Sequence, residues 1–108
     1  MKKGVRDEVS LLQEAIALQP ELQTIRRQLH QHPELSFQEY DTTAFIIEQL
    51  RSIQGLKIET GIEHVGLQTG VIATLSSGEG PTIAIRADID ALPITEDNAV
   101  DYASKNNG

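Results

Sequence analysis

The sequence contains no cysteine and no tryptophan, and aromatic residues make up only 4% of it. The absence of cysteine excludes disulfides and any thiolate metal site within this chain. With so few aromatic residues, an apolar core must rest on leucine, isoleucine, valine and alanine. The 108 residues are enough for one domain at most, and such a domain would fold alone with only a thin margin of stability.

Basic residues are also scarce. Nine lysines and arginines stand against sixteen aspartates and glutamates, which gives a net charge of −7. Nucleic acids and anionic membranes bind cationic surfaces, so this charge argues against both as partners. No apolar run approaches the roughly 18 residues that span a bilayer, and Asp7 and Glu8 interrupt what would be the apolar region of a signal peptide. We therefore expect a soluble, cytoplasmic protein.

The first half of the chain has the apolar spacing of helices. Apolar residues three and four positions apart predict one helix over 5–18 and a second over 20–32, where a proline follows. Ser36 and Glu39 have the spacing of a capping box, which predicts a third helix that begins there and ends near Gly55.

After residue 55 the pattern changes to that of β-strands. Residues 56–59 alternate between apolar and polar, and 71–75 and 82–85 are short apolar runs rich in β-branched side chains. The turn-forming residues 76–81 between these two runs predict a β-hairpin that joins them. Helices followed by strands indicate an α/β layer whose sheet is unfinished.

Two carboxylates, Asp88 and Asp90, follow the last apolar run. In open α/β sheets, sites lie outside the carboxyl ends of strands, and residues two apart on a strand point to the same side. Both carboxylates could therefore face one pocket and bind a hard or borderline cation, or orient another ligand of that cation. The alternative is a strand end that caps the following turn and pairs with Arg86. Spacing alone leaves both interpretations open.

The three histidines are weaker candidates for a site. His30 and His32 lie two residues apart at a predicted helix end, so they do not share a helix face and make a poor ligand pair. We expect both to cap or pack at that end, and we expect His64 to be solvated in a loop between glycines. Glu34 and Glu39, which also lie near helix ends, suit capping better than proton transfer.

Several ordered segments resemble motifs of one known family. They are Leu29–Ser36 (LHQHPELS) with Glu39, Thr42 and Thr43 after it, then Thr69–Ala73 (TGVIA), and finally Gly78–Glu96 (GEGPTIAIRADIDALPITE). These segments are similar, in the same order, to those of the metal-dependent amidohydrolases that include hippurate hydrolases, N-acyl-amino-acid amidohydrolases and indole-acetyl-amino-acid hydrolases. This family belongs to the aminoacylase-like metallopeptidases. Several motifs in order make the resemblance more specific than any single spacing.

The resemblance implies an α/β fold, namely the amino-terminal part of a zinc-peptidase-like catalytic domain with helices packed on a mixed sheet. Residues 1–108 would form the amino-terminal portion of that domain, and the rest of the domain and a lid used in dimerisation would be absent. The full enzyme would bind two divalent metals, zinc or manganese, and could form a homo-oligomer. It would hydrolyse the amide bond of N-acyl amino acids with a metal-activated water.

The resemblance also bears on Asp88 and Asp90. They align with a His-x-Asp motif of the wider metallopeptidase group, in which the histidine binds metal and the aspartate orients it. Because the histidine position holds Asp88 here, we assign neither residue as a metal ligand, and we expect Asp90 above all, with Asp88, to shape the catalytic site.

The family's later His-Ala-Cys-Gly-His-Asp motif is missing from this sequence. A pair of carboxylates without imidazole or thiolate partners does not hold two zinc ions. We therefore expect the 108-residue chain by itself to bind no metal and to be inactive. The alternative is a non-catalytic remnant or an interaction module built on the same half-fold.

Overall fold

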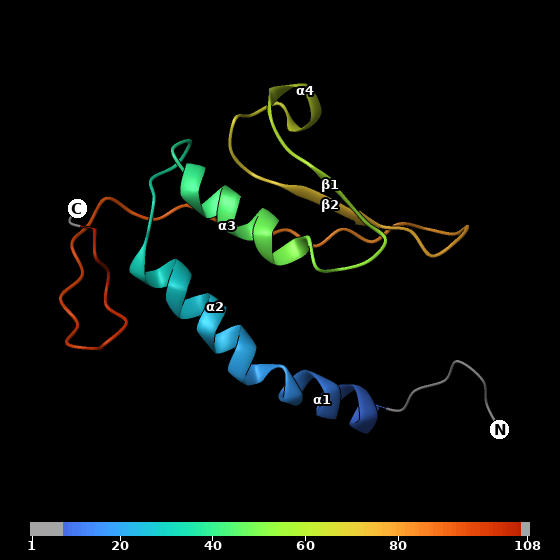
Figure 1. Ribbon diagram of the computed structural model, residues 1–108, viewed down its shortest axis with the longest axis horizontal. Helices are drawn as coiled ribbons and strands as arrows, with labels where there is room; N and C mark the ends of the chain where they lie inside the picture. Colours follow the sequence, from blue (N-terminus) through green and yellow to red (C-terminus); the bar gives the residue numbers. More distant parts are fainter. Residues whose placement is uncertain (1–7, 107–108) are drawn as a thin grey trace.

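The computed structural model describes residues 8–106, and its helices and strands fall in two arms (Figure 1). One arm consists of two consecutive helices, and the other combines a third helix with a small sheet and a short fourth helix. In chain order the elements are α1 (Glu8–Ala17), α2 (Gln19–Gln31), α3 (Tyr40–Leu50), β1 (Leu56–Glu59), α4 (Ile62–Val65) and β2 (Ile72–Leu75). In this described range, no helix is long and apolar enough to cross a membrane.

The first two helices confirm the prediction from apolar periodicity, apart from the predicted positions 5–7, which lie outside the described residues. α2 begins at Gln19 and has Pro20 in its first turn, where the missing N–H group costs no hydrogen bond. It ends at Gln31, and the backbone N–H of His32 closes the last turn by donating to the carbonyl of Leu29 at 3.3 Å. Pro33 then keeps the chain out of helical geometry.

The third helix begins later than the capping-box spacing predicted. It starts at Tyr40, and Glu39, the residue before it, makes no capping bond with its side chain. Phe37 adopts a left-handed backbone with φ of 66°, so the chain turns between Ser36 and Glu39 instead of coiling. The helix also ends earlier than predicted, at Leu50.

Glu34 caps the start of α3 in place of the predicted box. Its carboxylate accepts hydrogen bonds from the backbone N–H groups of Asp41 at 3.1 Å and Thr42 at 2.6 Å. Desolvation raises the pKa of Glu34, but the hydrogen bonds from the side chain and backbone of Thr42 and from the backbone of Asp41 outweigh it, so the pKa lies below its ordinary value. The expectation that Glu34 caps a helix is thus confirmed.

The sheet pairs different strands from those predicted. β1 and β2 lie at the expected places but pair with each other, antiparallel, with Leu56 opposite Leu75 and Glu59 opposite Ile72. Gly55, with φ of 80°, makes the turn that leads into β1. The segment between β1 and β2 contains α4, so the expectation of a loop around His64 was wrong. His64 is exposed, as expected.

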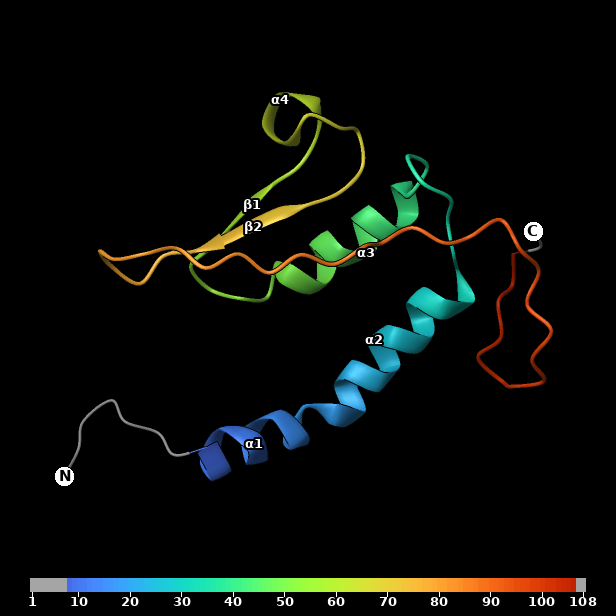
Figure 2. The same ribbon diagram turned by 180° about the vertical axis from the view of Figure 1, so that it is seen from behind.

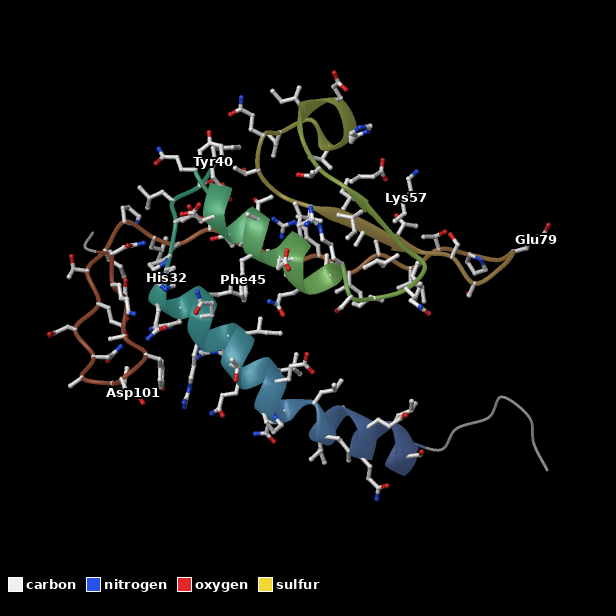
Figure 3. The ribbon with its side chains drawn as sticks, in the orientation of Figure 1. His32, Tyr40, Phe45, Lys57, Glu79 and Asp101 are labelled. Carbon is white, nitrogen blue, oxygen red and sulfur yellow. The ribbon has the colours of Figure 1, made fainter. Side chains whose placement is uncertain are left out.

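The predicted hairpin between 71–75 and 82–85 does not form. Residues 82–85 are not in a strand, and the side chains of Ile83 and Ile85 are 88% and 96% exposed. The turn at 76–81 extends away from the helices, with Glu79 at its far tip (Figure 3), and the chain returns along α3 in an extended form (Figure 2). Because an apolar strand needs a neighbouring strand or a covering layer to be stable, this segment remains an extended stretch.

No apolar side chain is buried anywhere in the described range. The four buried residues are all polar: Glu39, Thr42, Thr43 and Thr69. The radius of gyration is 17.1 Å, whereas a compact domain of this length has about 13 Å. Phe45 extends from α3 toward α2 (Figure 3), but the helices do not close over a core. The expectation of an incomplete α/β domain is therefore confirmed, whereas the sheet described is antiparallel and not mixed.

Candidate functional site

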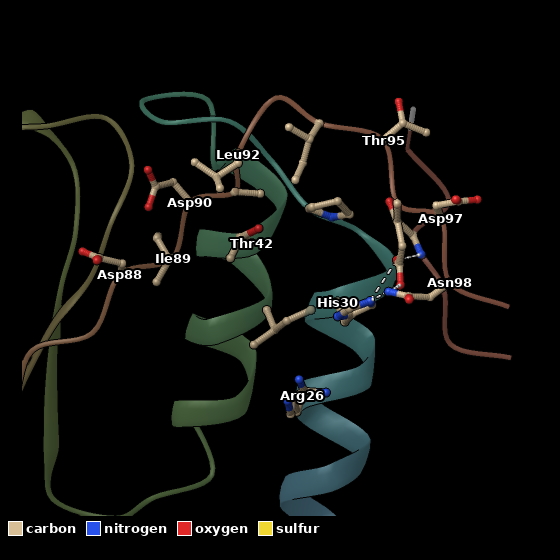
Figure 4. Close-up of a pocket in the computed structure, with 16 residues that line it drawn as sticks. Arg26, His30, Thr42, Asp88, Ile89, Asp90, Leu92, Thr95, Asp97 and Asn98 are labelled. Atoms are coloured by element: carbon tan, nitrogen blue, oxygen red, sulfur yellow. Dashed lines mark hydrogen bonds and ion pairs between the residues drawn. The ribbon is translucent and has the colours of Figure 1, made fainter. Parts of the chain in front are cut away.

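A cleft of about 810 Å³ lies between the C-terminal end of α2, the start of α3 and the segment 88–98 (Figure 4). Its apolar lining includes Leu29, Ile89 and Leu92, and Asp88 and Asp90 line it as well. This is the place where the sequence predicted a site, directly after the last apolar run.

Asp88 and Asp90 line the same cleft, but they are not held as a metal-binding pair. The Arg86 guanidinium donates a hydrogen bond to Asp88 at 2.6 Å, and both groups are largely exposed. Asp90 is also exposed, and Figure 4 shows both carboxylates directed away from His30. This arrangement includes the pairing with Arg86 that the alternative interpretation expected. The roles of Asp88 and Asp90 in catalysis remain predictions.

On the other side of the cleft, Glu96 is the centre of a hydrogen-bond cluster. His30 Nε2 lies 2.9 Å and 3.0 Å from the two carboxylate oxygens of Glu96. The backbone N–H of Ser104 donates to the same carboxylate at 2.7 Å, and the Asn98 side-chain amide donates at 3.0 Å. The His30 hydrogen bond, with those from Ser104 and Asn98, lowers the pKa of Glu96 to about 2 despite partial desolvation. Glu96 is therefore ionised at neutral pH.

Aromatic contacts surround this cluster. The ring of Tyr102 meets the ring of His30 edge-on, with centroids 5.7 Å apart, and the Arg27 guanidinium lies 4.2 Å from the Tyr102 ring centroid. His30 thus packs at the end of α2, as the sequence predicted. Its partner Glu96 was missed, because the two residues lie 66 positions apart and no local spacing connects them.

A second polar cluster joins α3 to the loop before β2. The Thr69 hydroxyl donates to the Glu39 carboxylate at 3.0 Å, and the Gly70 N–H donates to the Thr43 hydroxyl at 2.9 Å. Glu39 was expected to cap a helix; that expectation was wrong, because its side chain turns toward Thr69 instead. These residues hold the sheet against α3.

The described residues do not fit a metal centre. Within the range 8–106 no group of three or more histidine, aspartate and glutamate side chains is placed to hold a metal ion. His30 is engaged by Glu96, and the sequence supplies no cysteine.

Comparison with known proteins finds longer relatives of this chain, although no family model matches it. It is 50% identical over 92 residues to the N-acetyl-L-cysteine deacetylase of Bacillus subtilis (strain 168), which covers 84% of this chain and 21% of that protein. It is 44% identical over 85 residues to thermostable carboxypeptidase 1 of Saccharolobus solfataricus, covering 78% of this chain and 21% of that protein. The chain thus spans about a fifth of the length of these relatives.

Two solved structures are similar to this chain in both fold and sequence. One is a dinuclear metal-binding peptidase of the M20 family from Bacillus subtilis, with a TM-score of 0.75 and 48% identity over 85% of this chain and 25% of that one. The other, from methicillin-resistant Staphylococcus aureus and described as an aminohydrolase, has a TM-score of 0.81 and 42% identity over 91% of this chain and 25% of that one. In sequence and fold, the chain is therefore similar to metal-dependent peptidases and amidohydrolases of the M20 family, as the ordered motifs indicated, and it spans about a quarter of the two solved chains.

Proposed function

We propose that this chain is the amino-terminal portion of the catalytic domain of a metal-dependent hydrolase that cleaves the amide bond of N-acyl amino acids. The observation that carries the proposal is the 50% identity over 92 residues with an N-acetyl-L-cysteine deacetylase, whose name describes removal of an acyl group from an amino acid. The rest of the catalytic domain, and a lid through which the enzyme forms a homo-oligomer, would lie in the parts of the relatives that this chain does not span.

The full enzyme would use two divalent metals, zinc or manganese. The solved M20 relative is a dinuclear metal-binding peptidase, and bound metals of this kind polarise a carbonyl group and lower the pKa of a bound water. The described residues of this chain do not fit such a centre, so its ligands would come from other parts of the enzyme. We expect the 108-residue chain by itself to bind no metal and to be inactive.

In the full enzyme, this chain would supply one wall of the substrate cleft. Asp90, together with Asp88, would shape the site and orient groups contributed by the rest of the enzyme. Both residues line the cleft and are exposed, which leaves them accessible to such groups.

The experiment compares the 108-residue chain with a chimera. In the chimera, this chain replaces the matching 92 residues of the Bacillus subtilis deacetylase, and the unmodified deacetylase is the positive control. Release of free amino acid from N-acetyl and N-benzoyl amino acids is measured with and without added Zn²⁺ or Mn²⁺. We expect metal-dependent turnover by the chimera and none by the chain alone.

Two results would contradict the proposal. Turnover by the 108-residue chain that is lost in Asp90→Ala would show that the chain holds a complete site. A folded chimera that is inactive with every substrate and metal, beside an active control, would instead favour a non-catalytic module built on the same half-fold.

A further inference from the structure

The carboxylate of Glu96 joins two parts of the chain that are far apart in sequence. It binds His30 in the last turn of α2 at 2.9 Å and 3.0 Å, and it accepts the Ser104 N–H at 2.7 Å and the Asn98 amide at 3.0 Å. Figure 4 shows His30 and Asn98 reaching this carboxylate from different elements. The Glu96 side chain is only 13% exposed, so its donors replace most of its water.

The segment 96–106 depends on such contacts for its position. It contains no helix or strand, and no apolar side chain in the described range is buried beneath it. Its other links to α2 are also polar or aromatic. The Lys105 N–H donates to the Gln31 carbonyl at 2.8 Å, the Gln31 side-chain amide donates to the Asp101 carbonyl at 3.2 Å, and Tyr102 contacts Arg27 and His30. The Gln31 carbonyl is one of the last four of α2, which have no partner within the helix.

The position of this segment determines the shape of the cleft. His30, Glu96, Asn98 and Ser104 line the same cleft as Asp88 and Asp90. Figure 4 shows His30 and Asn98 on the opposite side of it from Asp88 and Asp90. If the Glu96 cluster opened, one wall of the cleft would lose its fixed distance from the other.

We propose that Glu96 is a positioning residue. Bound to His30, it fixes the segment 96–106 against α2 and so sets the wall of the cleft that faces Asp88 and Asp90. The role of this cleft in a reaction site rests on the proposed function. The placement of the segment 96–106 rests only on its contacts with α2. Charge supports it, because the hydrogen bonds from His30, Ser104 and Asn98 keep the pKa of Glu96 near 2 and the carboxylate ionised at neutral pH.

The test measures backbone amide hydrogen exchange in the 108-residue chain by NMR. Glu96→Gln weakens the three hydrogen bonds to the carboxylate, and we expect Ser104 amide exchange to rise about tenfold, as for loss of a hydrogen bond to a charged group. Asp97→Asn is the matched control, since it removes the same charge from the next residue, which lines the cleft outside the Glu96 cluster. We expect the control to leave Ser104 exchange within about twofold of the unmodified chain, since it breaks no hydrogen bond to Glu96.

A second measurement needs no change to Glu96. The carboxyl ¹³C resonance of Glu96 should titrate with a pKa of about 2 in the unmodified chain. In His30→Gln the pKa should move up toward the ordinary value of 4.5. In the control His64→Gln, which changes an exposed histidine in α4, it should not move. A purely packing role for His30 would leave the Glu96 titration unchanged.

Two results would overturn the inference: Ser104 exchange that is unchanged in Glu96→Gln, or a Glu96 pKa near 4.5 in the unmodified chain. In the active chimera, Glu96→Gln should lower kcat about tenfold with KM within about twofold, since a displaced wall misplaces reacting groups. An equal loss in Glu79→Gln, which changes an exposed glutamate at the tip of the 76–81 turn outside the cleft, would overturn the positioning role. An inactive chimera would contradict only the proposed function, because the NMR measurements require no turnover.

Discussion

Two polar junctions hold the described residues together, and they differ in burial and in charge. At the first, Thr69 donates to Glu39 and Thr43 accepts from Gly70, and the three side chains involved are all buried. At the second, His30 binds Glu96 at the open end of α2, where the imidazole is 32% exposed. The first junction depends on excluding water from its hydrogen bonds, and the second depends on the charge of Glu96. The difference shows how residues 8–106, among which no apolar side chain is buried, use polar contacts both to fold and to build a cleft.

The largest expected effect comes from breaking the buried junction. Thr69→Val removes the hydroxyl that donates to Glu39 and leaves a buried carboxylate without that donor. We expect a loss of about 2 kcal/mol in the free energy of unfolding, measured by urea denaturation followed by circular dichroism. Thr24→Val is the control, because the Thr24 hydroxyl makes only an exposed bond to the Pro20 carbonyl; it should change stability by less than about 0.5 kcal/mol. Equal losses in both variants would contradict the claim that the buried hydrogen bond of Thr69 stabilises the fold more than an exposed one does.

Acid should open the second junction. The folded pKa of Glu96 lies at about 2, below its ordinary value of 4.5, so the carboxylate stabilises the folded state above pH 4.5. That contribution is lost as the pH falls from 4.5 through 2, because the unfolded chain takes up the proton first. We expect the Tyr102 ring resonances to shift toward those of an unstructured peptide in this range.

Glu96→Gln is the control for the acid experiment, because a glutamine does not titrate. Its Tyr102 resonances should stay constant between pH 4.5 and 2. The same pH-dependent shift in the unmodified chain and in this variant would show that another group controls the junction.

A smaller effect should follow from the stacking of Arg27 on Tyr102. Arg27→Gln removes a cation–π contact at 4.2 Å, worth about 0.5–1 kcal/mol at an exposed site. Local opening of the segment, measured by amide exchange at Lys105, should increase accordingly. The neighbouring Arg26→Gln is the matched control, since Arg26 lines the cleft outside this stacking pair. If Arg26→Gln has the larger effect, the charge of α2 and not the stacking holds the segment.

The smallest effect concerns the extended segment 82–85. Ile85→Ser should change the stability of the 108-residue chain by less than about 0.5 kcal/mol, because Ile85 is 96% exposed. In the chimera the same substitution should lower the melting temperature, because the family fold would cover this segment. Equal stability of the chimera with and without the substitution would show that the segment stays exposed in the complete fold.

The elements of this fold could be predicted from the sequence where the signal is local. Apolar periodicity placed α1 and α2, the alternation of apolar and polar residues placed β1, and a short β-branched run placed β2. The pairing of β2 could not be predicted. The turn-forming residues 76–81 favour a hairpin between 71–75 and 82–85, whereas β2 pairs with β1. α4 was missed because the four residues Ile62–Val65 are too few to show a helical period.

The candidate site was predicted in part. The position of Asp88 and Asp90 beside a cleft followed from their place after an apolar run. The capping role of Glu34 was also predicted, from its place near a helix end. The role of Glu96 was not, because it binds His30 across 66 residues and no local pattern connects the two. The ordered motifs identified the family correctly, because they sample several parts of the fold at once.

The central claim is that this chain supplies a wall of the cleft and that the metal ligands lie elsewhere in an M20 enzyme. Equilibrium dialysis of the 108-residue chain and of the chimera against Zn²⁺ or Mn²⁺ tests it most directly. We predict two metals per chimera, as in the dinuclear relative, and no stoichiometric binding by the chain. Stoichiometric binding by the 108-residue chain that is lost in Asp88→Asn or Asp90→Asn would contradict the claim.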